Sequence, residues 1–242
     1  MRSSRSGTDP LDPGPGGFAH RGLHDESIPE NSLAAFEAAI ARGCGIECDI
    51  QLSGCHTAMV FHDRDGRRLC GNEHRLADHD AQTIGGWSIG TSAERVPSLA
   101  QLLELVDGRV PILVELKEEH RNGERVAAAA LRALSGYEGP VGVMSFSARA
   151  MRFVRITAPE VRRGLVLSDR DVALRRWDKR QRAQPQFLAV KVSLVDRGWV
   201  QSARGEMPVY SWTARTPEQA ARLAKFVDAP IWEGDGDPRT RP

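Results

Sequence analysis

Residues 45–63 read GIECDIQLSGCHTAMVFHD, and the fold of the whole chain can be worked out from this stretch. In residues 45–50, apolar side chains alternate with Glu47 and Asp49, which is typical of a β-strand. Because successive side chains of a strand point to opposite faces, both carboxylates project to the same side. We therefore expect a strand that presents two acids to one face of a sheet.

The second half of the stretch predicts a hairpin. The chain between Ile50 and His62 is too short for a helical crossover, and residues 53–56 are suited to a tight turn. A returning strand over residues 57–61 would bring His62 back to the level of Asp49. The hairpin thus places an imidazole near the two carboxylates.

Short apolar runs alternate with helical patterns along the rest of the chain, which is the sequence sign of parallel strands joined by helices. Eight parallel strands close a TIM-type barrel, and the 242 residues suit one such domain. We expect an α/β fold: a single-domain TIM (β/α)8 barrel with a short β-hairpin after the second strand. The expected strands cover residues 17–20, 45–50, 111–117, 141–146, 163–167, 187–192, 208–213 and 229–233.

Helix start signals support this alternation independently of the strand assignments. Ser98 and Gln101 form a capping-box pattern ahead of an apolar helical face. Thr216 precedes Pro217 in a second such pattern, with proline at the first helical position. Both segments are predicted to begin helices between strands.

The two ends of the chain are polar or rich in glycine and proline. We expect a flexible N-terminal tail over residues 1–16, the barrel over residues 17–234, and a C-terminal tail over residues 235–242. No apolar run resembles the core of a signal peptide or a membrane span. The sequence therefore predicts a cytoplasmic protein without stable membrane insertion.

Charge composition limits the partners. The 33 Lys and Arg residues nearly balance the 32 Asp and Glu residues, so the formal net charge is +1. Such a chain has no global positive field to hold a nucleic acid, and we expect a small-molecule substrate. The composition leaves the oligomeric state open.

The four cysteines are predicted to be reduced thiols, because no secretory signal accompanies them. A structural zinc site is the alternative, but no Cys-x-x-Cys pair is present, and Cys48 should face away from Glu47 and Asp49. The cysteines are Cys44, Cys48, Cys55 and Cys70.

Three acids are predicted to converge at strand ends: Glu47, Asp49 and Glu115. Like charges in a cleft repel one another unless a cation lies between them. Oxygen-only ligands favour magnesium, calcium or manganese over zinc. Ion pairing with surface arginines is the alternative, but it fits poorly with acids embedded in apolar strands such as ILVE at residues 112–115.

Two histidines and two cations end neighbouring segments. His20 and His62 each follow an apolar run, and histidine is suited to proton transfer near neutral pH. Arg21 and Lys117 match the two ways in which proteins hold phosphate, or they balance the carboxylates. Together these residues predict an enzyme that acts on a phosphate ester. The remaining histidines, His24, His56, His74, His79 and His120, are expected to be solvated.

The ordered motifs resemble those of the glycerophosphodiester phosphodiesterase family. They are HRG at 20–22, PENSLAAF at 29–36, ECD at 47–49, FHD at 61–63, ELK at 115–117, VMSF at 143–146 and YSWT at 210–213. The resemblance covers about residues 18–234 and implies a TIM barrel. It also implies hydrolysis of glycerophosphodiesters to glycerol 3-phosphate and an alcohol with a divalent cation, Mg2+ or Ca2+, with Mn2+ as a further option.

The resemblance also implies roles for individual residues. The metal ligands would be Glu47, Asp49 and Glu115, and His20 and His62 would be the general acid and base. Arg21 and Lys117 would bind phosphate, Glu30 would support the site beside His20, and Trp212 would line the substrate pocket or serve as a core aromatic. Which histidine is the acid, and whether water or a substrate hydroxyl attacks, stay open.

Two segments depart from the family pattern. The family usually has Asp-Gly in the hairpin turn where this chain has Ser53-Gly54-Cys55, and a Thr-Asp pair before proline where it has residues 231–234. Residues 64–97 have weak periodicity and are expected to form a substrate-covering loop.

Two other functions stay open. The first is a lysophospholipase D-like enzyme that holds an acyl chain with Ile84, Trp87 and Ile89. The second is a non-enzymatic barrel that binds phosphate ligands.

Overall fold

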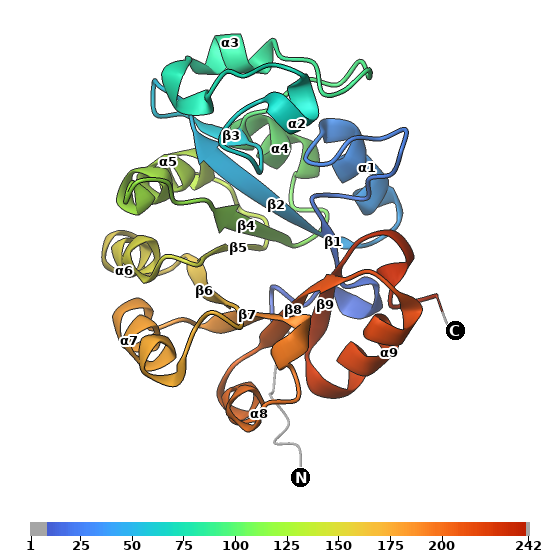
Figure 1. Cartoon of the computed structure of the whole chain (residues 1–242), viewed down its shortest axis with the longest axis vertical. Coiled ribbons are helices and arrows are strands. Elements are labelled where there is room, and N and C mark those ends of the chain that lie inside the picture. Colours follow the sequence, from blue (N-terminus) through green and yellow to red (C-terminus); the bar gives the residue numbers. More distant parts are fainter. Residues whose placement is uncertain (1–8, 241–242) are drawn as a thin grey trace.

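The computed structural model describes residues 9–240, and its backbone forms a closed barrel of eight parallel strands inside a ring of helices (Figure 1). The strands pair in the order β1-β2-β4-β5-β6-β7-β8-β9, and β9 pairs with β1 to close the barrel. They are β1 (Phe18–His20), β2 (Gly45–Leu52), β4 (Ile112–Leu116), β5 (Val141–Ser145), β6 (Arg162–Leu167), β7 (Phe187–Lys191), β8 (Val209–Ala214) and β9 (Ala229–Trp232). The predicted TIM barrel is confirmed.

The hairpin lies after the second strand, as predicted. The short strand β3 (Ala58–Val60) runs antiparallel to β2, with Ile50 opposite Val60. The backbone N–H of Phe61 then donates to the carbonyl oxygen of Asp49 at 2.9 Å. This bond brings His62, the next residue, to the level of Asp49.

Most helices follow a strand and lie outside the barrel. Ser98 begins α4 through a capping box with Gln101, and the Thr216 hydroxyl accepts from the N–H of Gln219 at the start of α9. Within residues 9–240, none of the helices combines the length and apolarity needed to cross a membrane. The α-helices are α1 (Leu33–Ala41), α2 (Arg67–Cys70), α3 (Ala81–Gly85), α4 (Leu99–Val106), α5 (Gly123–Leu134), α6 (Ala148–Thr157), α7 (Ala173–Ala183), α8 (Gly198–Glu206) and α9 (Pro217–Phe226). Four 3-10 helices cover Gly14–Gly16, Leu76–Asp78, Val192–Leu194 and Gly234–Gly236.

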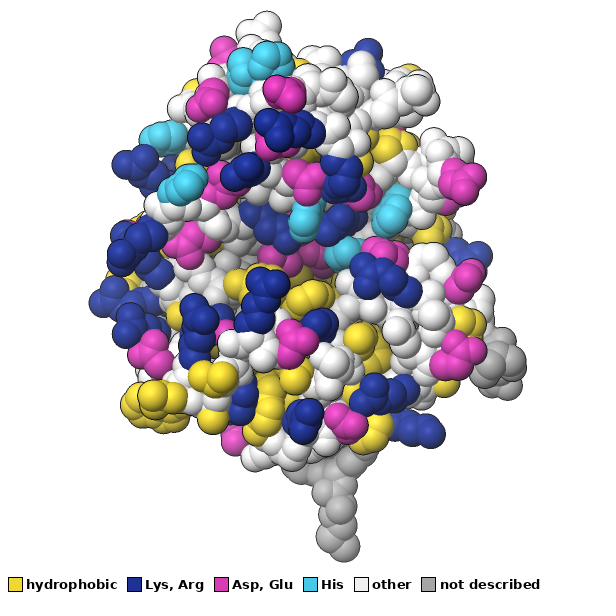
Figure 2. Space-filling view, in the orientation of Figure 1, with side chains coloured by type: hydrophobic (Ala, Val, Ile, Leu, Met, Phe, Trp, Pro, Cys, Tyr) yellow, Lys and Arg dark blue, Asp and Glu magenta, His cyan; other side chains and the backbone are white. Residues whose placement is uncertain are grey.

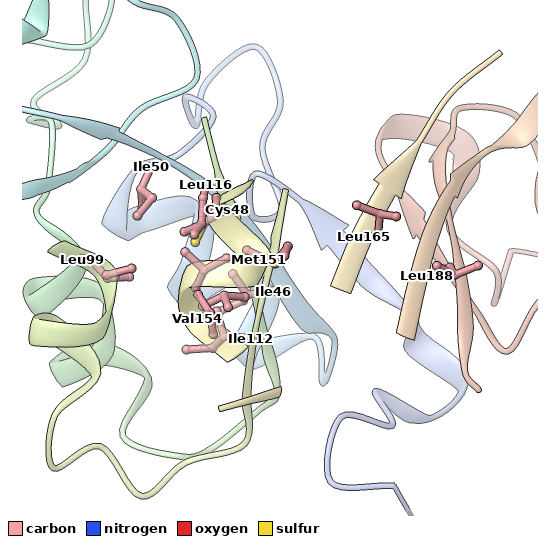
Figure 3. Close-up of a cluster of buried hydrophobic side chains, with 14 of the residues drawn as sticks. Ile46, Cys48, Ile50, Leu99, Ile112, Leu116, Met151, Val154, Leu165 and Leu188 are labelled. Carbon is pink, nitrogen blue, oxygen red and sulfur yellow. The ribbon is translucent and has the colours of Figure 1, made fainter. Parts of the chain in front are cut away.

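Successive side chains of β2 point alternately to the hydrophobic core and to the site. Ile46, Cys48 and Ile50 belong to the apolar cluster between the strands and the helices, which Figure 3 shows in part. Glu47 and Asp49, at the intervening positions, therefore point into the barrel. The outward position of Cys48 follows the predicted alternation, and all four cysteines are free.

An apolar cluster inside the barrel supports the site from below. It contains Leu11 and ring or aliphatic side chains from seven strands, among them Phe18, Leu113, Phe187 and Tyr210. Leu113 lies two positions before Glu115 on β4, so the same strand face carries first the core and then the site. The polar groups are thereby confined to the carboxyl end of the barrel, where active sites of this fold lie.

The segments expected to be tails make buried contacts where the structure describes them. Leu11 is only 1% exposed and packs inside the barrel, where Gly142 of β5 leaves room for it because it has no Cβ. At the other end, Asp237 is buried and pairs with Arg42 at 3.1 Å and with Arg239 at 2.8 Å. Both segments belong to the folded domain, and residues 1–8 lie outside the described part.

The segment 64–97 is more ordered than the predicted loop. It contains α2, a 3-10 helix and α3, and it encloses its own apolar cluster with Ile84 and Ile89 fully buried. In Figure 1 its distal part, α3, lies at the top, away from the barrel axis. Only its first residues, 64–68, approach the cavity described below.

Candidate active site

Three buried acids form the centre of the site. Asp49 on β2 and Glu115 on β4 are register partners, and Glu47 lies on the same face of β2. One oxygen from each carboxylate lies within 4.8 Å of the others, although the side chains are almost fully buried. Burial raises the pKa of Glu47 well above its ordinary value, and the charges of Asp49 and Glu115 raise it further. Three acids packed this closely therefore need positive charge beside them.

Two cations lie against this cluster. The Lys117 ammonium is 2.8 Å from Asp49 and 2.7 Å from Glu115, and the Nε of Arg21 is 3.1 Å from Asp49. Burial alone would raise the pKa of Asp49, but Lys117 and Arg21 hold it well below its ordinary value. Burial would lower the pKa of Lys117, but Asp49 and Glu115 raise it above its ordinary value. The structure thus brings together all the predicted charges at this face.

His20 ends β1 and pairs with an acid that the sequence did not single out. Its Nδ1 lies 2.5 Å from Oε2 of Glu233, and its Nε2 lies 3.9 Å from Oε2 of Glu47. Burial lowers the pKa of His20, whereas the hydrogen bond to Glu233 opposes this shift. Arg215 holds the other oxygen of Glu233 at 2.6 Å. Glu233 follows β9 in the segment that departs from the family pattern. Its position at the end of a strand was the feature of the sequence that could have indicated a role in the site.

His62, which follows the hairpin, has a similar arrangement. Its Nδ1 lies 2.7 Å from Oδ1 of Asp63, and its backbone carbonyl accepts from Gln51 at 3.0 Å. Each of His20 and His62 therefore has a carboxylate at Nδ1, which leaves the other ring nitrogen for a ligand.

Glu30 contacts Arg21, the residue that follows His20. Its Oε1 accepts a hydrogen bond from the Nη1 of Arg21 at 2.8 Å. The guanidinium of Arg68 donates two hydrogen bonds of 2.8 Å to the same carboxylate, one to each oxygen. Arg68 also reaches Asp63 at 2.7 Å, so one guanidinium links the supports of Arg21 and His62. Arg68 lies on α2, in the segment predicted to be a loop, and no sequence motif pointed to it.

Asn31 is a third residue to which sequence reasoning gave no role. It is fully buried with a positive φ of 56°, and its amide Nδ2 donates to Oδ2 of Asp49 at 3.1 Å. The backbone N–H of Asp49 donates in return to Oδ1 of Asn31. Asparagine tolerates this left-handed backbone better than most residues, which was a usable signal. Asn31 therefore fixes the orientation of Asp49, while Ser32 caps α1.

A cavity of about 890 Å3 opens beside these groups. His62, Glu115 and Lys117 line its inner end, and Phe146 forms part of its wall. The predicted pocket residue Trp212 packs edge-on against Phe146 at 5.5 Å, and its indole N–H donates to the carbonyl of Ala189. Trp212 thus lies between the apolar interior of the barrel and the wall of this cavity.

Two other histidines differ from expectation. His24 is half-buried, with its Nε2 3.9 Å from Glu233, so it belongs to the surroundings of His20. His79 is also half-buried and stacks edge-on against Trp87 at 5.6 Å. Both histidines lie in polar segments, so the sequence pattern did not predict these contacts.

The fold and the site define a (β/α)8-barrel protein with an acidic, cation-lined site at the carboxyl ends of its strands, and comparisons with known proteins assign the family. The model of the glycerophosphoryl diester phosphodiesterase family matches residues 20–231, so the chain belongs to this family. A glycerophosphodiester phosphodiesterase of Caldanaerobacter subterraneus subsp. tengcongensis is 30% identical over 62% of this chain. That match spans 65% of the relative, just under two thirds of its length.

Solved structures share the fold. A phosphodiesterase of Oleispira antarctica, solved with its product sn-glycerol-3-phosphate, superposes with a TM-score of 0.82 and 22% identity. The match covers 92% of this chain and 93% of the other. A glycerophosphodiester phosphodiesterase of Thermotoga maritima gives a TM-score of 0.75 at 22% identity, over 91% and 94% of the chains.

Proposed function

We propose that this chain hydrolyses glycerophosphodiesters to glycerol 3-phosphate and an alcohol, with a divalent cation and the histidines His20 and His62. One observation carries the proposal: three buried carboxylates lie near two histidines, each of which is held by an acid of its own. Family membership and the product bound to the Oleispira antarctica relative support the substrate class.

The acid cluster fits a divalent cation. Glu47, Asp49 and Glu115 offer only oxygen atoms, which suits Mg2+, Ca2+ or Mn2+. The raised pKa of Glu47 reflects an excess of negative charge that such an ion would offset. When bound, the ion would supply Lewis-acid polarisation of a phosphoryl oxygen.

Arg21 and Lys117 would hold the phosphate. Arg21 presents a planar fork and Lys117 a point charge, and both already lie beside Asp49. As negative charge builds on the phosphoryl oxygens in the transition state, these fixed cations stabilise it without reorganisation. Trp212 and Phe146 would contact the apolar part of the substrate.

The two histidines would divide proton transfer. One removes a proton from the attacking oxygen while the other gives a proton to the leaving alkoxide. Glu233 and Asp63 fix the ring orientation and stabilise the positive charge when each imidazole is protonated.

The burial of two of the three residues suggested for an acyl chain argues against such a site in residues 64–97. Ile84 and Ile89 are 0% and 1% exposed inside their own cluster, so they do not face a ligand. A phosphate-binding barrel without catalysis would not need both histidine–carboxylate pairs. The cytoplasmic location and the absence of nucleic acid among the partners stay predictions.

Turnover assays test the proposal. A panel of glycerophosphodiesters and lysophospholipids is assayed with Mg2+, Ca2+ or Mn2+, and the released alcohol is identified. We expect activity on glycerophosphodiesters that exhaustive chelation abolishes and that His20→Ala or His62→Ala lowers about a hundredfold or more. Activity that survives chelation would remove the metal from the proposal, and near-normal turnover of a histidine variant would remove that residue.

A further inference from the structure

A patch of exposed apolar side chains lies at the start of α7. Val172, Leu174 and Trp177 are 65%, 77% and 61% exposed, and they are three of the five exposed large hydrophobic side chains among residues 9–240. Figure 2 shows hydrophobic side chains gathered beside Lys and Arg side chains at the edge of this face, where α7 lies in Figure 1. A concentration of this kind marks a surface that contacts an apolar partner.

The same segment concentrates positive charge. Residues 170–182 contain six Lys or Arg residues and two Asp residues, a net charge of +4, whereas the whole chain carries +1. The remainder of the chain therefore carries −3. Arg170 and Arg175 are exposed, and neither makes an ion pair with any residue that the structure describes. The exposed guanidinium groups of Arg170 and Arg175 are thus available to an external anion.

The patch adjoins the mouth of the barrel. Arg170, Arg175 and Lys179 line the outer part of the cavity whose inner end is formed by His62 and Lys117. A surface that contacts α7 would therefore lie next to the entrance of the proposed active site.

We infer that this patch docks the protein on an anionic phospholipid surface. Leu174 and Trp177 are three residues apart, so they share a helix face and can enter the headgroup boundary together. Arg170 and Arg175 lie on the cavity side of this face, where they can meet lipid phosphates beside the inserted side chains. The contact is peripheral, directs the barrel mouth toward the membrane, and does not depend on hydrolytic activity.

Two other partners fit the patch less well. A two-fold dimer through α7 would bring the same patch of both copies together and set unpaired guanidinium groups against each other. A nucleic acid would match the charge, but it would leave Leu174 and Trp177 without an apolar environment. An anionic lipid surface satisfies both the apolar and the charged side chains.

Vesicle sedimentation tests the inference. The full-length protein is mixed with vesicles of phosphatidylcholine alone or of phosphatidylcholine with phosphatidylglycerol, at low and at high salt. We expect binding to the anionic vesicles about tenfold or more tighter than to the neutral ones, with loss at high salt. The double variant Leu174→Ser/Trp177→Ser and the double variant Arg170→Gln/Arg175→Gln should each weaken it about tenfold.

Ile156→Ser is the matched control, because Ile156 is 60% exposed on α6 outside the patch and its variant should bind like the wild type. The Leu174→Ser/Trp177→Ser variant should keep its circular dichroism spectrum and its turnover of a water-soluble glycerophosphodiester. Equal binding to neutral and anionic vesicles, or unchanged binding by both patch variants, would overturn the inference. So would a dimer in sedimentation velocity that the Leu174→Ser/Trp177→Ser variant loses without any vesicle binding by the wild type.

Discussion

The Nδ1 of His20 and the Oε2 of Glu233 lie 2.5 Å apart, although the residues are 213 positions apart in sequence. The contact joins the first barrel strand to the loop after the last, so it forms only when the barrel closes. Burial alone would raise the pKa of Glu233, but the bond to His20 keeps it well below its ordinary value. A charged carboxylate therefore holds the imidazole of His20.

Replacing Glu233 tests this relationship. Glu233→Gln should lower kcat about a hundredfold, because the neutral amide no longer favours the imidazolium or fixes its tautomer. The substitution should also lower the pKa of His20 further, since Glu233 raises it. If His20 is the general base, the acid limb of the pH–rate profile moves to lower pH; if it is the general acid, the alkaline limb does.

Glu206→Gln is the control for this experiment. Glu206 is an exposed glutamate of α8 that pairs with Arg180, and its variant should keep wild-type kinetics. A kcat for Glu233→Gln within a factor of two of the wild type would show that the contact with His20 has no catalytic role.

Lys117 offers a test of the cation site through stability. Lys117→Met should lower the free energy of unfolding of the metal-free protein by about 3 kcal/mol, because it removes the cation that lies against both of the buried acids Asp49 and Glu115. A divalent cation bound by the same acids should recover part of this loss. Urea denaturation with EDTA and with each cation measures both effects.

Lys191→Met is the matched control, since Lys191 forms an exposed pair with Asp169 and should change stability by less than about 1 kcal/mol. If the loss for Lys117→Met is the same with and without divalent cations, the acid cluster does not bind them.

The barrel and the central charges could be predicted from sequence because they depend on local periodicity. The alternation around Glu47 and Asp49 fixes which face they occupy, and the short connection to His62 requires a hairpin. Both expectations use only the spacing of neighbouring residues, and the structure has the strand and the hairpin where they were expected.

The supporting residues could not be predicted in the same way. Glu233, Arg68 and Leu11 act through contacts with residues that are remote in sequence, and Arg68 and Leu11 also lie in segments without a clear period. Which residues they contact depends on how the barrel closes and on the path of residues 64–97. For Asn31, the sequence indicated a residue that tolerates a left-handed backbone, but it did not predict the contact with Asp49.

Arg68 predicts a pH-dependent contribution to stability. Burial would raise the pKa of Glu30 and of Asp63, but Arg68 helps to lower both below their ordinary values. A carboxyl group whose pKa is lowered in the folded state stabilises it above the unfolded pKa, about 4, and this stabilisation is lost as pH falls through the folded pKa. Arg68→Met should therefore cost about 1 kcal/mol at pH 7, because Arg68 is half exposed, and progressively less below about pH 4.

Urea denaturation between about pH 3 and pH 7 measures this difference. Arg67→Met is the neighbouring control, because Arg67 makes only an exposed contact of 3.8 Å with Glu73 and should have little effect at any pH. A difference between wild type and Arg68→Met that does not change with pH would exclude the carboxylates as its source.

Leu11 predicts that the amino-terminal segment contributes to the fold and not to the chemistry. Leu11→Ala should lower the free energy of unfolding by about 2–4 kcal/mol, because it leaves a cavity among Phe18, Phe187 and Tyr210 inside the barrel. Turnover at a temperature where both proteins are folded should stay within a factor of two, since the cluster lies at the end of the barrel opposite the site. Leu174→Ala removes the same atoms from an exposed position and should change stability by less than about 0.5 kcal/mol. If the two variants were equally stable, residues 9–16 would not contribute to the stability of the fold.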